Sequence, residues 1–383
     1  MQSANKFRLF RRGRTEVGRC QQNEQVSHPV SAKQILALRL RSQRIDPVGG
    51  ADVVGTARHL LAMQAQDFAQ ALWAVGLRSA GTGRSDVLAA LQRGELVRSL
   101  PMRGTLHFVA SEDLRWMLDL TARRTLQAAA TRFTALGLDQ ETLDAAERVT
   151  RAALAGGGSM SREEFMSLLT ANGIAPDGQR GYHVIFYLCQ LAVICWGPPS
   201  GTQQALVLVD EWIPASPERE RDEALASFAL RFFASHGPAT ERDFAWWTKL
   251  TLRDVRAAIA ILGDRLTALT HEGSEYLIAT DALADGIPSA PRAAVLTLPG
   301  FDEYLLGYQD RSLALETEHA WRIVPGNNGI FFPMIVSKGE VIGSWRRNPK
   351  TRLAEPDFFV EPGSPQLAAF DRAAKRYRVF QSR

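Results

Sequence analysis

Two glutamines flank a small residue in the segment Gln64-Ala65-Gln66, where an amphipathic pattern running from Asp52 to Met63 predicts the end of a helix. A glutamine side chain cannot titrate, but its amide can orient a water molecule or stabilise developing positive charge through its dipole. Glutamine is also common at helix ends, so a structural or surface role is the alternative. The pattern alone favours that alternative.

Four further side chains could bind nucleic acid. Arg103 and His107 lie on a predicted hairpin close in sequence to the glutamine pair, and Arg253 and Arg256 lie on the polar side of a predicted helix. Arginine binds phosphate, and the second helix of a helix-turn-helix enters the major groove. The alternatives are a buried strand histidine for His107 and an ordinary solvated helix face for the two α-helical arginines.

Adjacent acids occur in the run Phe301-Asp302-Glu303-Tyr304. Paired carboxylates can serve acid–base catalysis, but near DNA they more often orient arginine side chains, which is the interpretation that we favour. The sequence has no Gly-x-Gly-x-x-Gly after a strand, no P-loop and no His-Glu-x-x-His. We therefore expect no cofactor and no metal.

The elements that must position these residues follow one order three times, in which helices are followed by a β hairpin. This is the order of a winged helix. We predict winged-helix units at residues 31–125, 126–215 and 216–290, in an α+β fold. The hairpin loop Gly197 to Thr202 of the second unit could probe the minor groove of DNA.

The two ends of the chain differ from the rest in composition and sequence pattern. Residues 291–383 contain short β-rich runs broken by glycine and proline, which predicts a small C-terminal β-barrel and a tail. Residues 1–30 are predicted to form a basic, flexible N-terminal extension. Its first 27 residues have a net charge of +4, which is also the charge of the whole chain, so the remaining residues are balanced in charge. Net charge alone therefore does not indicate nucleic-acid binding.

Composition bounds the class of protein. The chain has 383 residues, of which 45% are hydrophobic and 22% charged, as expected for a globular protein of several modules. No apolar run reaches the roughly 18 residues of a membrane helix. Cys20, Cys189 and Cys195 form no Cys-x-x-Cys pair, which predicts reduced thiols and a cytoplasmic protein, associated with the nucleoid when bound to DNA.

From about residue 31 to 360, the chain resembles the AlkZ/YcaQ-type bacterial DNA glycosylases, which are tandem winged-helix DNA-binding domain proteins. The motifs that carry the resemblance are Met63-Gln64-Ala65-Gln66-Asp67 with Leu72-Trp73, Arg103 to His107, Gly237 to Thr240 with Phe244 to Trp247, Leu298 to Tyr308, and Gly329 to Pro333 with Gly343 to Arg347. The basic extension lies outside the shared region and leaves the mature start open.

The resemblance implies that Gln64 and Gln66 are catalytic, and the second glutamine matches the AlkZ-like branch. It implies a monofunctional DNA glycosylase that excises purines alkylated at N7 or N3 from double-stranded DNA by hydrolysis of the N-glycosidic bond. Such a base is already cationic and leaves without a strong general acid. The sequence leaves interstrand crosslinks open as a further substrate.

A non-catalytic winged-helix transcriptional regulator is the alternative function. A regulator usually needs a dimer to read paired half-sites. Nothing in the sequence resembles a coiled coil or another obvious dimerisation segment, so we expect a monomer. A regulator would tolerate Gln64→Ala and Gln66→Ala, whereas an enzyme would lose turnover and still bind DNA.

Overall fold

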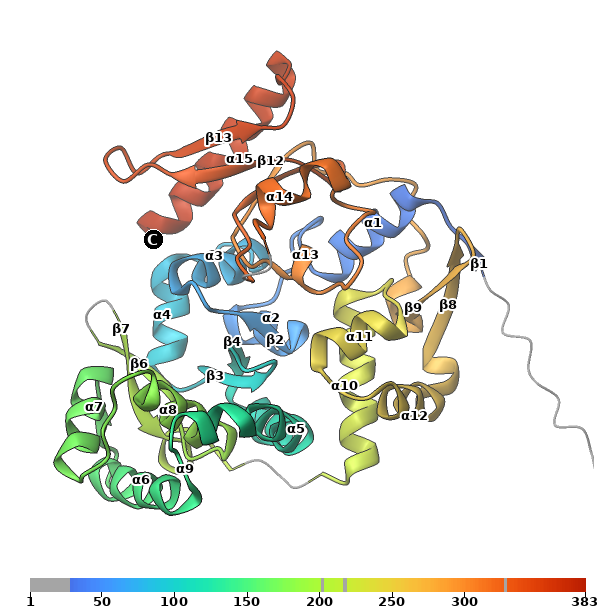
Figure 1. Cartoon of the computed structure of the whole chain (residues 1–383). Helices are drawn as coiled ribbons and strands as arrows, with labels where there is room; N and C mark the ends of the chain where they lie inside the picture. Colours follow the sequence, from blue (N-terminus) through green and yellow to red (C-terminus); the bar gives the residue numbers. More distant parts are fainter. Residues whose placement is uncertain (1–27, 201–202, 216–218, 327–328) are drawn as a thin grey trace, which may run out of the picture.

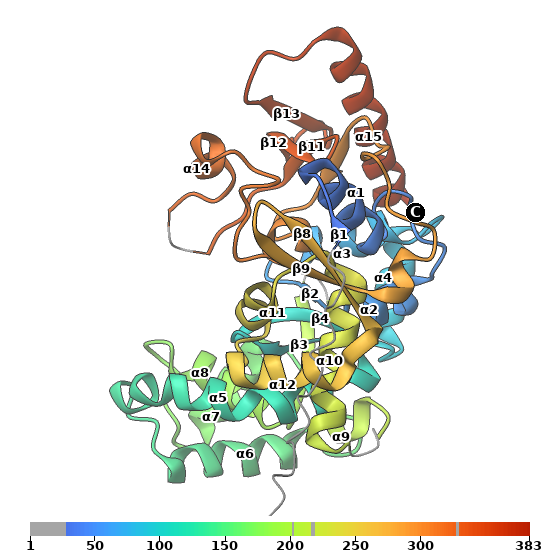
Figure 2. The same cartoon turned by 90° about the vertical axis from the view of Figure 1, so that its right-hand side faces the viewer.

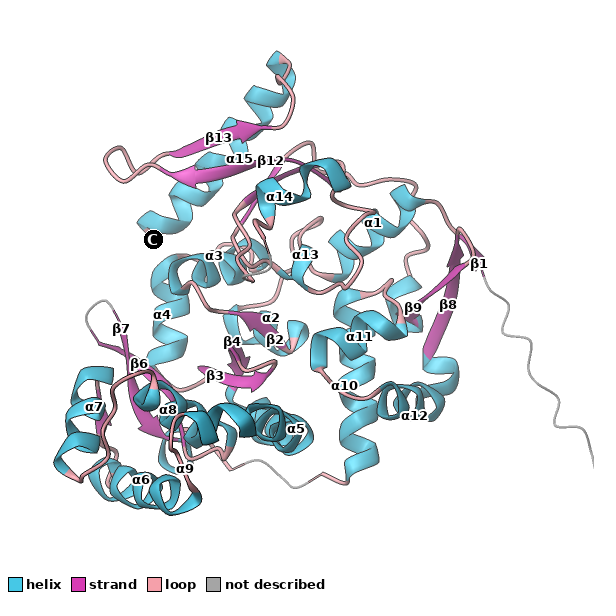
Figure 3. Ribbon diagram, in the orientation of Figure 1, coloured by secondary structure: helices cyan, strands magenta, loops and turns pink. Residues whose placement is uncertain are grey.

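The computed structural model describes residues 28–200, 203–215, 219–326 and 329–383, which form a mixed α+β fold with three sheets in these ranges. Figure 3 shows helices gathered around short strands. In Figure 1, and from the side in Figure 2, the last strands with helix α15 lie at one end and helices α6 and α7 at the other. None of the described helices combines the length and apolarity needed to cross a membrane.

The first region contains the glutamine pair. Its elements are α1 (Ala32–Ser42), α2 (Val53–Leu60), β2 (Ala62–Gln64), α3 (Phe68–Arg78), α4 (Arg84–Gln92), β3 (Leu96–Met102) and β4 (Thr105–Ala110). The helix predicted from Asp52 to Met63 is shorter, because Leu61 adopts a φ of 65° and the next residues pair with β4. Gln64 therefore lies in a strand rather than at a helix end.

The second region follows the long helix α5 (Leu114–Ala135). Its elements are α6 (Gln140–Leu154), β5 (Ser159–Met160), α7 (Arg162–Ala171), α8 (Arg180–Gln190), β6 (Ile194–Ser200), β7 (Gln203–Leu208) and α9 (Val209–Trp212). A capping box of Ser161 and Glu164 begins α7. Strands β3 and β6 pair, so the first two regions share one sheet of order β2-β4-β3-β6-β7-β5. The tip of the predicted loop 197–202, at residues 201–202, lies outside the described residues.

The third region repeats the same order of elements. It comprises α10 (Arg221–His236), α11 (Glu241–Thr248), α12 (Leu252–Leu262), β8 (Leu266–His271) and β9 (Ser274–Ala279). Ala239 bridges Leu277 of β9, as a short strand would. Strand β1 (His28–Pro29) pairs with β8, so the last residues of the predicted extension 1–30 join this sheet; residues 1–27 lie outside the described part.

The C-terminal region is an open sheet packed against a helix. Its elements are β10 (Leu296–Leu298), α13 (Glu303–Leu306), α14 (Ala320–Ile323), β11 (Met334–Ser337), β12 (Glu340–Arg347), β13 (Ala354–Phe358) and α15 (Ser364–Ser382). Short 3-10 turns lie elsewhere, at Ser111–Asp113, Gly263–Arg265, Thr280–Leu283 and Thr317–His319.

The predicted C-terminal β-barrel is wrong for the described residues. Closure requires the first and last strands of a sheet to pair, but β10 pairs only with β11, and β13 only with β12. The three-residue strand β10 packs against α15, which buries Ala369, Phe370, Tyr377 and Phe380 in the core. Within residues 291–383, predicted as a barrel and tail, a helix therefore covers the sheet.

A buried ion pair joins this region to the first. Both guanidinium Nη atoms of Arg78 bond the carboxylate of Asp302, at 2.9 and 2.7 Å, and both side chains are fully buried. Asp302 also accepts from the Tyr304 backbone N–H and so begins α13. The largest hydrophobic cluster likewise combines residues 36–108 with residues 295–380. The N-terminal and C-terminal regions are thus packed as one core. Cys189 and Cys195 are free and buried, and Cys20 lies outside the described residues.

We expect Asp302→Asn to lower the free energy of unfolding by about 3–5 kcal/mol, because it leaves the Arg78 charge buried without a counter-ion. The double variant Arg78→Met/Asp302→Leu should lose much less free energy of unfolding than the sum of the losses in the single variants Arg78→Met and Asp302→Leu. Urea unfolding of all variants measures this coupling. Arg256→Gln, in an exposed pair with Glu241, is the control and should cost at most about 1 kcal/mol; additive losses at Arg78 and Asp302 would contradict the coupling.

Candidate active site

The backbone of Gln64 is held from both sides. Strand β2 places Gln64 opposite His107 of β4. On its other side, the Gln64 backbone N–H donates to Glu303 Oε1 at 3.0 Å. Gln64 is only 8% exposed, so its position is set by the sheet and by a carboxylate from the C-terminal region.

Arg103 holds the Gln64 side chain. Met102 and Thr105 pair across the hairpin, which leaves Arg103 and Gly104 as a two-residue turn. Their φ angles of 56° and 66° match a type I′ turn, in which a residue other than glycine or asparagine is strained. From this turn, Arg103 Nη2 donates to Gln64 Oε1 at 3.0 Å. The strained turn thus aims a cation at the amide.

The same Arg103 nitrogen bonds His107. His107 Nδ1 lies 2.7 Å from the Thr105 carbonyl oxygen, which can only accept, so Nδ1 carries the proton. His107 Nε2 is then free to accept from Arg103 Nη2 at 3.0 Å. Burial, with the Arg103 charge, lowers the pKa of His107 to about 3, and burial lowers the pKa of Arg103 to about 10. At neutral pH the histidine is neutral and the arginine is charged.

Glu303 lies at the centre of a second set of contacts. Trp247 Nε1–H donates to Glu303 Oε2 at 2.8 Å, and His236 Nε2 lies 3.5 Å from the same oxygen. Burial by itself raises the pKa of Glu303, but His236 and Arg103 outweigh burial and bring the pKa below its ordinary value. The carboxylate is therefore ionised and acts as an acceptor, not as a proton donor.

Gln66 differs from Gln64 in exposure. Its side chain is exposed, and its Oε1 accepts from the Leu106 backbone N–H at 3.4 Å. Arg98 fixes the backbone around it, with Nε donating to the Ala65 carbonyl at 2.9 Å and Nη2 to the Gln66 carbonyl at 3.3 Å. The side chain of Gln64, at the end of β2, is thus almost enclosed, whereas the side chain of Gln66, just beyond it, is open to solvent.

This geometry can orient water without proton transfer. Each amide Oε1 accepts one bond from the protein and keeps a second lone pair. Water that donates to these lone pairs would present its own lone pair to an electrophile. Arg103 Nη1 is buried without a hydrogen-bond partner among the described residues, so a further donor is available there.

Cations gather around an indole next to Arg103. The ring centre of Trp246 lies 5.3 Å from Arg103 Cζ, 5.7 Å from Lys249 Nζ and 5.1 Å from Arg311 Cζ. Trp246 and Lys249 also line a groove with Arg124 and Arg242. This basic groove, close to the glutamine pair, suits a polyanion.

The four predicted DNA-binding residues separate into two places. Arg103 and His107 join Gln64, and His107 is fully buried. Arg253 and Arg256 are exposed on α12, where Arg256 makes a bidentate pair with Glu241 at 2.9 and 2.7 Å. Within the described part of the chain, α12 contributes nothing to the Gln64 network. DNA contact by any of the four stays a prediction.

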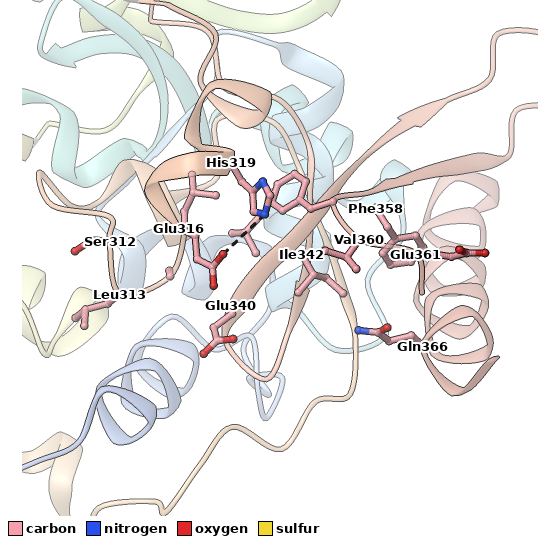
Figure 4. A pocket seen from close by; sticks show the side chains of 14 residues that line it. Ser312, Leu313, Glu316, His319, Glu340, Ile342, Phe358, Val360, Glu361 and Gln366 are labelled. Carbon is pink, nitrogen blue, oxygen red and sulfur yellow. Dashed lines mark ion pairs between the residues drawn. The ribbon is translucent and has the colours of Figure 1, made fainter. Parts of the chain in front are cut away.

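A separate cavity of about 440 Å³ is acidic. Figure 4 shows Glu316, Glu340 and Glu361 around it, with His319 facing Glu316. Glu316, Glu318 and His319 have ligand atoms within 4.8 Å of one another, so this group could hold a metal ion. None of its lining residues belongs to the Gln64 network, and its negative lining would repel phosphate. The cavity therefore lies outside the candidate site around Gln64.

Sequence reasoning missed several residues of this network. It predicted a DNA contact for Arg103 but not its bond to Gln64, and it did not connect Glu303, Trp247 or His236 with the glutamines. For the adjacent acids Asp302 and Glu303, the sequence favours a role in orienting arginine side chains, and Asp302 bonds Arg78. The missing information was spatial, because Gln64 and Glu303 are 239 positions apart.

Comparisons with known proteins agree over most of the chain. A family model described as DNA glycosylase AlkZ-like matches residues 57–380. An interstrand DNA cross-link repair glycosylase from Streptomyces sahachiroi is 27% identical over 329 residues, which cover 82% of this chain and 87% of that protein. The solved structure of Streptomyces sahachiroi DNA glycosylase AlkZ is similar with a TM-score of 0.77 and 24% identity, over 91% of this chain and 96% of that one.

The buried neutral histidine makes stability depend on pH. The folded-state pKa of His107 is about 3 against 6.5 for a free side chain, so between these values the unfolded chain binds more protons and stability falls as pH falls. Between pH 7.5 and 5, His107 should account for a loss of about 2 kcal/mol. Urea unfolding of wild type and His107→Gln at both pH values measures this. An unchanged pH dependence in the variant would contradict a buried neutral His107.

Proposed function

The chain belongs to the AlkZ-like DNA glycosylase family, and from this premise we propose that it excises N7- or N3-alkylated purines from double-stranded DNA. The observation that carries the proposal is the pair of fixed glutamine amides, Gln64 and Gln66, of which Gln64 is oriented by Arg103 and supported by Glu303. Membership of this family favours the enzyme over a non-catalytic regulator. We further propose that it acts as a monomer in the cytoplasm, where its DNA substrate lies.

The proposed reaction is hydrolysis at the anomeric carbon. The bond between C1′ and the base nitrogen breaks, and its electron pair neutralises the alkylated, cationic base. Water oxygen bonds to C1′ and its proton passes to solvent. Gln64 and Gln66 would accept hydrogen bonds from this water and place their amide dipoles beside the positive charge that develops on the sugar. No lysine amine is needed as a nucleophile, so the enzyme is monofunctional.

Interstrand crosslinks are a second proposed substrate. The relative from Streptomyces sahachiroi is an interstrand DNA cross-link repair glycosylase, and it aligns over 82% of this chain. A crosslinked base cannot be flipped out freely, because it remains bonded to the opposite strand. The exposure of Gln66 suits an open site that acts on such a base without complete extrusion.

We propose that the three repeats of helix, short strand, two helices and hairpin are winged helices. In the third, α12 occupies the place of a recognition helix. Its exposed arginines, Arg253 and Arg256, would then meet phosphates. The groove lined by Arg124, Arg242 and Lys249 would bind the phosphate backbone of the same DNA closer to Gln64.

Removing both amides tests the proposed chemistry. We expect wild type to release 7-methylguanine from methylated duplex DNA, and Gln64→Ala/Gln66→Ala to be slower by about 10²–10³-fold because water and charge lose their fixed partners. DNA affinity, measured on both proteins, should change little. The single variants Gln64→Ala and Gln66→Ala measure how much of the loss in release rate comes from each glutamine.

A release rate that is unchanged in the double variant would remove the glutamines from the mechanism. Absence of release by wild type, with binding intact, would argue against excision of small alkylated purines and would make crosslinked DNA the next substrate. A loss of binding in the double variant would indicate a DNA-contact role for the pair instead of a catalytic one.

Neutralising α12 tests the phosphate contacts. Arg253 has no ion pair within the described residues, whereas Arg256 is already paired with Glu241. We expect Arg253→Gln to weaken binding to all sequences alike and to reduce the slope of log K against log salt by about 0.9. Arg346→Gln, exposed in the C-terminal sheet and paired with Glu355, is the control. Equal salt slopes for wild type and Arg253→Gln would contradict a phosphate contact.

A further inference from the structure

A cavity of about 530 Å³ opens beside Arg103. One wall is α5, which presents small residues at Ala128 and Ala129, and the opposite wall is α8, with the rings of Tyr182 and Phe186. This volume lies within the usual range of sites that enclose small organic ligands. The two alanines leave room that a larger residue on α5 would fill.

Three of the polar side chains that line the cavity are bonded to the protein. Thr121 Oγ1 donates to the Pro101 and Met117 carbonyls, and Thr125 Oγ1 donates to the Thr121 carbonyl. His183 Nδ1 is bonded to the Gln179 carbonyl. Apart from these three side chains and three cations, the lining residues are apolar or aromatic. An apolar or aromatic group requires only surface contact.

Three cations form part of the cavity wall. Arg103, Arg124 and Lys249 all line the cavity, and Arg103 also holds Gln64. These cations suit the phosphates that flank a damaged nucleotide. Because Arg103 joins this largely apolar cavity to Gln64, the cavity suits a group attached to the base rather than a free apolar molecule.

We propose that this cavity binds the apolar or aromatic body of a bulky adduct carried by the alkylated base, and so makes the enzyme accept large lesions. The inference rests on the proposed glycosylase activity and names its substrate class. Tyr182 and Phe186 supply ring contacts, and the small side chains of Ala128 and Ala129 supply space.

The test compares a small and a bulky lesion at the same atom. Duplex DNA containing 7-methylguanine or 7-benzylguanine is treated with wild type, Ala128→Trp and Ala130→Trp, and release of each base is followed in single-turnover reactions. Ala128 is exposed at the cavity, so tryptophan there fills it without disturbing the core; Ala130 is exposed on the same helix but outside the cavity.

We expect Ala128→Trp to slow release of 7-benzylguanine by about 10–200-fold, while release of 7-methylguanine stays within about threefold of wild type. Ala130→Trp should leave both rates near wild type. Retained release of 7-methylguanine also shows that the variant is folded and binds DNA.

Three results would overturn the proposal: equal slowing of both bases by Ala128→Trp, no slowing of either, or release of 7-methylguanine but not 7-benzylguanine by wild type. These are distinct from a failure of the proposed function, in which wild type releases neither base. In that case the cavity would have no adduct to bind, and the inference falls with the activity.

Discussion

The buried carboxylate of Glu303 is the constraint on which the site depends. It belongs to the C-terminal region, yet it accepts hydrogen bonds from the Gln64 backbone and from the Trp247 indole. An ionised carboxylate without partners would be very costly in the core, so these donors must reach it for the chain to fold. Its neighbour Asp302 is tied to Arg78 in the same way. Two successive acids therefore tie together α3, β2 and α11.

This constraint explains why a site built on amides can be precise. A glutamine side chain is flexible, and fixing it costs conformational entropy. Here the backbone of Gln64 is fixed by Glu303 and its amide by Arg103, whose own position follows from a strained two-residue turn and from neutral His107. The ordering cost is met during folding, before substrate arrives, which is the condition for electrostatic preorganisation.

The sequence predicted local structure well, because local structure depends on neighbouring residues. The order of helices followed by a hairpin in the third region, with a cap at Thr240 and a turn at Glu272 and Gly273, follows from residues that are close in sequence. The barrel was wrong, because strand closure depends on distant pairing that short β-rich runs do not encode. The α+β class and the family were recognisable from motifs, whereas the contact of Glu303 with Gln64 joins segments that no local pattern relates.

The sheet shared by the first two regions links the candidate catalytic residues with the cavity. Strand β3 pairs with β4 on one side and with β6 on the other, so the hairpin that carries Arg103 is continuous with the region that contains α8. Arg103 contributes to both places, through its bond to Gln64 and through the cavity wall. A shift of β6 relative to β4 would have to break sheet hydrogen bonds, and α8 packs against β3 and β6. The adduct that we propose for the cavity would therefore be held relative to Gln64 and Gln66 by the sheet and the helix packed on it, and not by a flexible loop.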